Sequence, residues 1–252
     1  MVLYAGIDLH STNSVVVVLD ERDKVVRRAR LTNQLETIAS WLEPYRDALV
    51  GVVVESTYNW YWLVDGLNER GYTMHLANTV AIRQYDGLKH RNDVSDARWL
   101  ATLLRLGQLP EGYIYPRKVR AIRDLLRKRT QLVRQNTSNL LSIQNLFSRN
   151  TGTSINANPV KRLTPEAVDE VFEDPNVALA VKSNVAVMRC LREQISLVED
   201  SVHGQVRLRK PYRRLITVPG IGKILALTIM LERACYHMIK GDTEFEVRHA
   251  FL

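Results

Sequence analysis

The sequence predicts that four carboxylates gather around divalent metal when the chain folds. Asp8, in the segment GIDLH, follows an apolar run, and Glu55 ends the β-branched run of VVVES. Both acids therefore come off strands that are apolar enough to be buried in one sheet. Asp93 and Asp96, in NDVSDA, are spaced i and i+3 and share one face near the start of a predicted helix. Mg²⁺ or Mn²⁺ binds such oxygen ligands and keeps positions open for phosphate, so the set predicts two-metal phosphodiester chemistry.

Each acid also has an ordinary structural interpretation. Asp96, taken alone, is more readily explained as a first-turn acid that favours the positive end of its helix, and Asp93 alone is a weaker candidate still. Asp8 and Glu55 are harder to explain in that way, because a carboxylate at the end of a buried strand is costly without a metal or a hydrogen-bonding partner. The order and local contexts of the four acids together favour a site.

The histidines and cysteines add little evidence for other chemistry. The six histidines form no HExxH or His/Cys cluster, and His10, two residues past Asp8, is the one placed to approach the same metal or phosphate. Cys190 and Cys235 are too few and too far apart for a disulfide framework or a zinc site, which fits a reducing cytoplasm. The longest nearly apolar run, Ile224 to Leu231, is too short to span a bilayer, so no membrane role is expected.

The motifs together resemble a known family. GIDLH with its following strand, VVVES, KHRNDVSDARWLA and the later LITVPGIGKILALTIMLE are similar to the DEDD transposases of bacterial insertion sequences and to the pilin-gene-inverting recombinases. The resemblance extends to the region of Glu232 and implies a RuvC-like first domain whose acidic residues are Asp8, Glu55, Asp93 and Asp96. It further implies Mg²⁺- or Mn²⁺-dependent cleavage and strand transfer at DNA ends or junctions, in many members aligned by a structured non-coding RNA.

The charge of the chain favours a nucleic-acid partner. The 252 residues carry a formal net charge of +8, with a pI of about 9.6, and the positive charge is concentrated in residues 117–134, where Asp124 is the only acid. Apolar residues recur there at helical spacing, so one stripe is expected to pack while the basic remainder faces phosphate, although a charge run is also commonly a solvated face. The predicted nucleic-acid-binding residues of this segment are Arg117, Lys118, Arg120, Arg123, Arg127, Lys128, Arg129 and Arg134.

The hydrophobic pattern predicts an α/β fold of ribonuclease H type for residues 1–112, which the resemblance implies is RuvC-like, followed by a helical arm over 113–206. Strands alternate with helices in the first segment after an antiparallel meander. In the arm, two long helices separated by a loop predict an antiparallel coil, which the resemblance implies is a route to homo-oligomers. The expected elements are strands within 2–32, a helix over 35–42, the Glu55 strand, a helix over 59–70, a short strand over 72–76, helices over 97–106 and 118–148, a loop over 150–158, a helix over 165–172 capped by Thr164, and a helix from 177 to 206.

Residues 207–252 are predicted to be a partial C-terminal transposase domain. In its VPGIGK turn, Gly220, Gly222 and Lys223 are expected to hold a phosphate as helix-hairpin-helix elements do, and an ordinary loop capping a core helix explains the motif nearly as well. By resemblance, a further domain with a nucleophilic serine is expected beyond Glu232, but no serine occurs after Ser201. We therefore expect a copy truncated at its C-terminus, with DNA strand exchange impaired and the metal site intact.

Two other classes of protein stay open at this stage. GIDLHSTNSVVVVLD also resembles the first phosphate loop of actin-like ATPases, although that loop has a small residue where His10 stands and the second phosphate signature is absent. A nucleic-acid-binding protein without catalysis would keep the basic helix and treat the acids as vestigial. The four acids in their order favour the transposase.

Overall fold

The computed structural model of the protein describes residues 1–82, 93–205 and 210–239. The chain divides into two compact units, Met1–Ile114 and Tyr115–Leu252, each with a core of its own. The predicted truncation rests on residues 233–252, and of these 240–252 lie outside the described residues. The separate C-terminal domain predicted over 207–252 stays a prediction.

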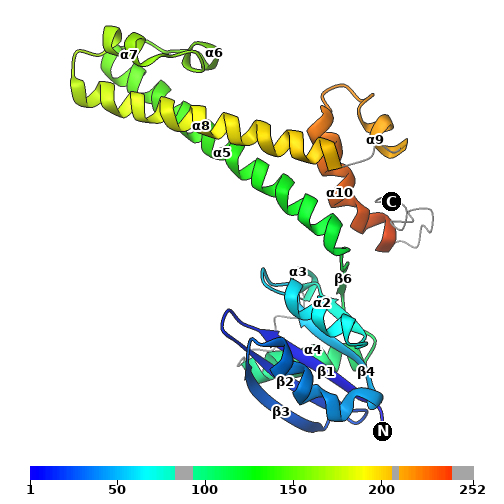
Figure 1. Ribbon diagram of the computed structural model, residues 1–252. Helices are drawn as coiled ribbons and strands as arrows, with labels where there is room; N and C mark the ends of the chain where they lie inside the picture. Colours follow the sequence, from blue (N-terminus) through cyan, green and yellow to red (C-terminus); the bar gives the residue numbers. More distant parts are fainter. Residues whose placement is uncertain (83–92, 206–209, 240–252) are drawn as a thin grey trace. The chain divides into compact units, whose positions relative to one another are not determined.

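The N-terminal unit is built on one mixed sheet of six strands in the order β3-β2-β1-β4-β5-β6 (Figure 1). The first three strands form the antiparallel meander that the sequence predicts, β4 and β5 continue in parallel with β1, and β6 closes the edge antiparallel to β5. The α/β class expected from the sequence is confirmed by this sheet and its helices. The strands are β1 (Leu3–Leu9), β2 (Asn13–Asp20), β3 (Val25–Thr32), β4 (Leu49–Glu55), β5 (Met74–Ala77) and β6 (Glu111–Gly112).

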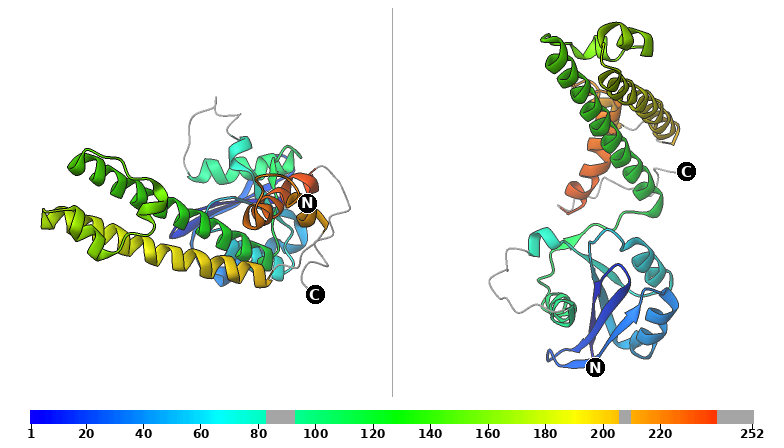
Figure 2. Two further views of the ribbon diagram at one scale, coloured as in Figure 1. Left: turned by 90° about the horizontal axis from the view of Figure 1, so that it is seen from above. Right: turned by 90° about the vertical axis from the view of Figure 1, so that its left-hand side faces the viewer.

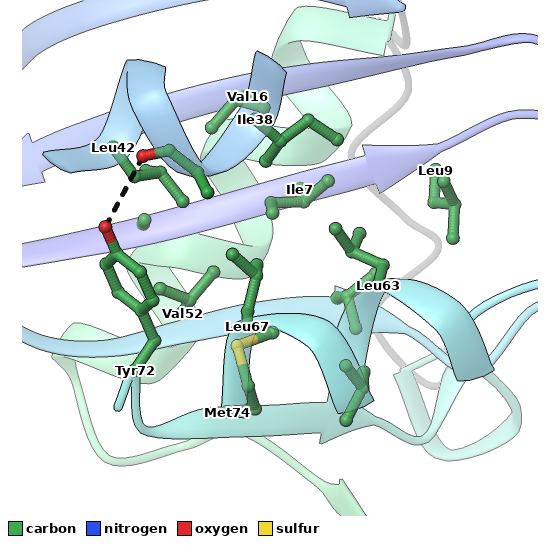
Figure 3. Packing of buried hydrophobic residues seen from close by; sticks show 14 of the residues in the cluster. Ile7, Leu9, Val16, Ile38, Leu42, Val52, Leu63, Leu67, Tyr72 and Met74 are labelled. Carbon is green, nitrogen blue, oxygen red and sulfur yellow. Dashed lines mark hydrogen bonds between the residues drawn. The ribbon is translucent and has the colours of Figure 1, made fainter. Parts of the chain in front are cut away.

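Helices cover both faces of this sheet (Figure 2, right-hand view). On one face, Ile7 and Val52 of the strands pack against Ile38 of α1 and Leu63 of α2, and the Tyr72 hydroxyl lies 3.5 Å from the Ala39 carbonyl oxygen (Figure 3). On the other face lies α4, in contact with β1, β2 and β4, and Ile82 of α3 packs into the cluster beside it. The helices of this unit are α1 (Leu35–Leu42), the 3-10 helix η1 (Glu43–Ala48), α2 (Tyr61–Glu69), α3 (Thr79–Ile82) and α4 (Asp93–Arg105).

A glycine allows α4 to lie directly on β1. A Cβ atom added at Gly6 would stand 1.9 Å from the Ala97 carbonyl oxygen and 2.8 Å from the Ala101 nitrogen. The two alanines of the helix are fully buried against the sheet. Only glycine fits on the strand at this crossing, so Gly6 sets how closely the helix approaches β1.

The turn between β2 and β3 ties down the other end of α4. Asp23, in the left-handed region at φ 64°, accepts hydrogen bonds from Arg98 Nη2 at 2.6 Å and from Thr102 Oγ1 at 2.8 Å. Arg105 Nη2 lies 3.3 Å from the same carboxylate. These bonds lower the pKa of Asp23, although burial alone would raise it. The helix that carries Asp93 and Asp96 is thus fixed at both ends of its contact with the sheet.

The second unit is dominated by two long helices, α5 (Arg117–Thr151) and α8 (Pro175–Gln205), which lie side by side in every view (Figures 1 and 2). In the C-terminal half of α5, Ile143 and Phe147 pack against Val181 and Met188 of α8. The predicted Thr164 cap is confirmed, because its hydroxyl oxygen accepts from the Ala167 amide at 3.3 Å. The shorter helices are α6 (Ala157–Val160), α7 (Pro165–Val171), α9 (Lys210–Leu215) and α10 (Lys223–Ile239).

Among the described residues, none of the helices combines the length and the apolar character that crossing a membrane requires.

Candidate metal centre

The sheet places Asp8 and Glu55 next to each other on the face that α4 covers. The parallel pairing of β1 with β4 ends at Ile7 opposite Val54, and the next position on each strand holds Asp8 and Glu55. Glu55 in turn pairs with Ala77 of β5, which packs with Leu100 of α4. Because side chains alternate between the faces of a sheet, both acids point to the α4 side.

The direction of α4 brings its first turn over the end of β1. Gly6 lies under Ala97 and Ala101, so two residues further along the strand the helix presents its earlier positions. Within the described residues, those positions begin with Asp93, and Asp96 follows one turn later on the same face. The carboxyl end of β1 and the amino end of α4 therefore meet at Asp8.

His10 stands between the two closest carboxylates. Its Nε2 atom lies 3.2 Å from Asp8 Oδ2 and 3.3 Å from Asp93 Oδ2. Ligand atoms of these three residues all lie within 4.8 Å of one another, which makes them a potential metal-binding group. Nε2 is enclosed by protein, yet it makes no hydrogen bond of acceptable geometry with either carboxylate.

Two asparagines hold the backbone that presents this imidazole. The side-chain amides of Asn33 and Asn59 each donate to the His10 carbonyl oxygen at 2.9 Å. The His10 amide donates to the Asn13 carbonyl oxygen at 2.9 Å, which closes the turn after β1. The residues that follow β3 and β4 therefore fix the conformation of the segment that follows β1.

The two carboxylates beside His10 have opposite electrostatics. Asp8 is 7% exposed, and burial is the largest of the effects that raise its pKa. His10 acts in the opposite direction, the charges of Asp96 and Asp93 add to the rise, and Arg30 has a smaller lowering effect. The pKa of Asp93 is lowered, chiefly because the Arg30 guanidinium donates a hydrogen bond to it. The centre thus holds one buried acid that resists losing its proton and one acid that is fixed as a carboxylate.

The structure brings together part of the predicted acidic set. Asp8 and Asp93 meet at His10, and Asp96 is near enough for its charge to act on Asp8. Glu55 is half-buried at the adjoining strand end and is not among the three residues whose ligand atoms converge. His10 was not one of the four predicted ligands, but its place two residues beyond a strand-end aspartate had marked it as the histidine able to approach the same metal or phosphate.

The donor set fits a divalent cation. Carboxylate oxygens suit Mg²⁺ and Mn²⁺, imidazole nitrogen suits the transition metals, and Mn²⁺ accepts both. A bound cation would also neutralise the carboxylates that crowd Asp8 and would provide a partner for the Nε2 atom that lacks a hydrogen bond. Both features are reasons for this part of the chain to bind metal.

The predicted basic residues of α5 divide into three groups. Arg117, Lys118, Arg127, Lys128 and Arg134 are exposed, and Arg123 and Arg129 are half-buried. Arg120 is 3% exposed, so the expectation that the whole basic set faces outward is wrong for this residue. It lies on the packed side of the helix beside Val119 and Ile122, where the helical period places it.

Three of these arginines also bind carboxylates of the same unit. Arg123 Nη2 and Arg127 Nε lie 2.6 and 2.9 Å from the carboxylate of Glu232 on α10. Arg129 Nη2 lies 2.8 Å from Glu199 on α8. These ion pairs were not predicted from the sequence, and they join the basic segment to the neighbouring helices.

The VPGIGK turn is exposed at the start of α10. Gly220 adopts φ 85°, a conformation that favours glycine, and a Cβ atom at Gly220 or Gly222 would meet nothing within 4 Å. Lys223 is exposed as the first residue of the helix. The turn has the open surroundings that a phosphate would need, and its predicted binding role stays a prediction.

Comparison with known families identifies the class of protein. A family model described as a transposase, that of the IS110-type DEDD transposases, matches residues 5–149, which is more than half of the 252 residues. The chain belongs to this transposase family, as the resemblance implied. A search of curated proteins finds no match. The matched segment contains all four predicted acids, and the match favours the transposase over the actin-like ATPase.

Proposed function

We propose that the N-terminal unit is a ribonuclease H-like, RuvC-type nuclease domain that cuts DNA with a divalent cation held by Asp8, Glu55, Asp93 and Asp96. The observation that carries the proposal is the meeting of Asp8 with the first turn of α4, where a buried acid has a raised pKa among further acids. The strand order, with three antiparallel strands followed by two parallel ones, supports the fold assignment.

The residues of the site have distinct roles in this proposal. Asp8 and Asp93 supply the first oxygen ligands, and Arg30 keeps the Asp93 side chain ionised and oriented. In this proposal, Asp96 and Glu55 lie beside the two ligands and become further ligands when substrate and cation are bound. A Mg²⁺ or Mn²⁺ ion held by these residues would polarise the scissile phosphate and would stabilise the charge that develops on the leaving oxygen.

The exposed basic residues are proposed to contact the nucleic-acid backbone. Lys118, Lys128 and Arg134 are exposed on α5, and phosphate contacts of this kind position a nucleic acid without reading its sequence. Gly220, Gly222 and Lys223 are proposed as a second phosphate contact at the start of α10. We propose DNA as the substrate and a structured non-coding RNA as an additional partner, as the family resemblance implies.

The helical arm is proposed to join copies of the chain. Leu141 on α5 and Leu179 and Leu197 on α8 are 52%, 64% and 61% exposed. Exposed leucines on a long helical pair are suited to a contact between helices of two copies. A shift of the molar mass to that of the monomer in Leu179→Glu and Leu197→Glu, measured by light scattering, would support this role, and an unchanged mass would exclude it.

The cleavage proposal is tested on labelled junction DNA. The full chain is incubated with Mg²⁺ or Mn²⁺, and the strands are separated on a denaturing gel. We expect metal-dependent cut strands with the parent and with the control Glu36→Gln, a change on the far face of the sheet, and a loss of about 10³-fold or more with Asp96→Asn. DNA binding without any metal-dependent cut would instead favour the non-catalytic nucleic-acid-binding protein, and equal cutting by Asp96→Asn would exclude the assigned site.

A further inference from the structure

We propose that His10 is a metal ligand, so that the cation of this site is bound by an imidazole nitrogen as well as by carboxylates. The proposal rests on the metal site proposed above and adds a residue outside the four acids. The inference starts from the Nε2 atom, which faces two carboxylates and has no hydrogen bond of acceptable geometry.

The distances match neighbouring positions around one cation. An octahedral ion with bonds of about 2.1 Å places neighbouring ligand atoms roughly 3 Å apart. Nε2 lies 3.2 Å from Asp8 Oδ2 and 3.3 Å from Asp93 Oδ2, slightly beyond that separation. A small contraction of the three side chains around an ion would complete the geometry.

An ordinary ion pair explains the arrangement less well. A protonated imidazole would donate Nε2–H toward one of the two carboxylates, and such charge-assisted bonds are short, at about 2.7–2.9 Å. Here both separations are longer, and Nε2 forms a proper hydrogen bond with neither group. The imidazole side chain is 37% exposed, so Nε2 is enclosed by its position between the acids and not by burial of the whole ring.

The backbone of His10 is fixed before any cation binds. Asn33 and Asn59 donate to its carbonyl oxygen, and the Oδ1 atom of Asn33 accepts in turn from Ser14 Oγ at 2.7 Å. Ser14 is fully buried. These bonds hold the backbone position from which the imidazole reaches the two carboxylates.

A nitrogen ligand has a measurable consequence for metal choice. Mg²⁺ prefers oxygen ligands, whereas Mn²⁺ also binds imidazole well. The His10 nitrogen should therefore raise the affinity for Mn²⁺ more than the affinity for Mg²⁺. Replacing His10 by asparagine, which offers an amide oxygen, should lower the Mn²⁺-over-Mg²⁺ preference by about tenfold.

The proposal is tested by pulsed electron paramagnetic resonance on Mn²⁺ bound to the full chain. Modulation of the Mn²⁺ echo by a directly bound ¹⁴N nucleus is expected for the parent and for the control His75→Gln, which changes a histidine paired with Glu111. The modulation should disappear in His10→Asn, while calorimetry still detects bound Mn²⁺ and the thermal unfolding of the variant shows that it is folded.

The outcomes separate this inference from the proposed function. Tight Mn²⁺ binding without nitrogen modulation in the parent would overturn the assignment of His10 and leave the carboxylate site standing. Modulation that persists in His10→Asn would also overturn it, because another nitrogen would then be the ligand. A parent chain that binds no Mn²⁺ would contradict the proposed metal site itself.

Discussion

The acids around Asp8 and the carboxylate of Glu232 show two opposite ways of placing charge in one chain. Burial and the neighbouring carboxylates of Asp96 and Asp93 raise the pKa of Asp8. Glu232 on α10 is also partly buried, which would raise its pKa, but hydrogen bonds from Arg127 and Arg123 outweigh burial and lower it. The first arrangement leaves negative charge in excess of its local partners, and the second balances it.

This difference separates a functional site from a structural contact. The charge of Glu232 is matched by arginines of the same unit, and neighbouring contacts hold these residues in place. Arg123 also lies 4.4 Å from the centre of the Tyr115 ring, and the Tyr115 hydroxyl donates to the Leu231 carbonyl oxygen. In the proposed function, a bound cation supplies the partner that the carboxylates around Asp8 lack. A cluster of charged residues in a sequence therefore does not by itself indicate a functional site. What distinguishes the two arrangements is whether each charge has a partner of opposite charge within the protein.

The largest effect is expected from Gly6→Ala, which separates α4 from β1 without changing any charge. The added Cβ would overlap the Ala97 carbonyl oxygen at 1.9 Å, so the helix must move. Chemical unfolding should show a loss of at least about 3 kcal/mol, at the upper end of overpacking costs, together with loss of Mn²⁺ binding. Gly112→Ala is the matched control, because its Cβ would meet nothing closer than 3.5 Å. Equal stability of Gly6→Ala and the parent would contradict the close crossing.

Glu232→Gln tests the balanced arrangement. Two arginines would lose their carboxylate, and we expect a loss of about 1–2 kcal/mol of unfolding free energy at pH 7 with Mn²⁺ affinity unchanged. Because the pKa of Glu232 is lowered in the folded state, its ionised form stabilises the fold at pH values above the ordinary pKa of 4.5. This stabilisation is lost as the pH falls through the folded-state pKa. The difference between variant and parent should therefore shrink on acidification below pH 4.5. Exposed Glu170→Gln is the control, and an equally small effect of both changes would show that the contact does not stabilise the unit.

Asp8→Asn should have the opposite sign in metal-free buffer. Because the pKa of Asp8 is raised in the folded state, the contribution of Asp8 to stability is greatest at pH values below its ordinary pKa of 3.8. This contribution falls as the pH rises through the folded-state pKa. Asparagine removes that loss, so the variant should melt a few degrees above the parent at pH 7 in the presence of a chelator. The gain should vanish below pH 3.8, where Asp8 is protonated in both states. A lower melting temperature for the variant at pH 7 would show that the ionised Asp8 side chain is not destabilised by burial and by the neighbouring carboxylates.

The smallest effect on stability is expected from the exposed basic face of α5. Changing Lys118, Lys128 and Arg134 together to glutamine should leave the unfolding free energy within about 0.5 kcal/mol. The slope of log binding constant against log salt for duplex DNA should fall by roughly 0.9 for each contact that is lost. The control carries the same change of charge at exposed residues elsewhere in the unit, namely Arg149, Lys161 and Arg189. Equal slopes for the two triple variants would show that the face is only solvated.

The sequence predicts the meander, the long helices and the positions of the acids, because these depend on local patterns. Asp8 and Glu55 end apolar strand runs, and Asp93 and Asp96 have helical spacing. The two-residue strand β6 carries no periodic signal, and the sequence therefore predicts no element there. The four-residue helix α6 was likewise read as part of a polar loop.

Contacts between distant segments could not be predicted in the same way. The backbone at His10 is held by Asn33 and Asn59, and the crossing at Gly6 depends on a helix that begins some ninety residues later. Arg123 and Glu232 are 109 positions apart, and their pairing follows from the packing of α5 with α10. No local pattern distinguishes an arginine with such a partner from one that faces water.

Calorimetric titration of the metal-free chain with Mn²⁺ tests the central claim most directly. The parent and Glu36→Gln should bind Mn²⁺ equally well, because Glu36 is exposed on the opposite side of the sheet. Asp8→Asn and Asp93→Asn should each bind at least about tenfold more weakly, since each removes an oxygen ligand from the same ion. Equal affinity for all four proteins would contradict the claim that the end of β1 and the start of α4 form a metal site.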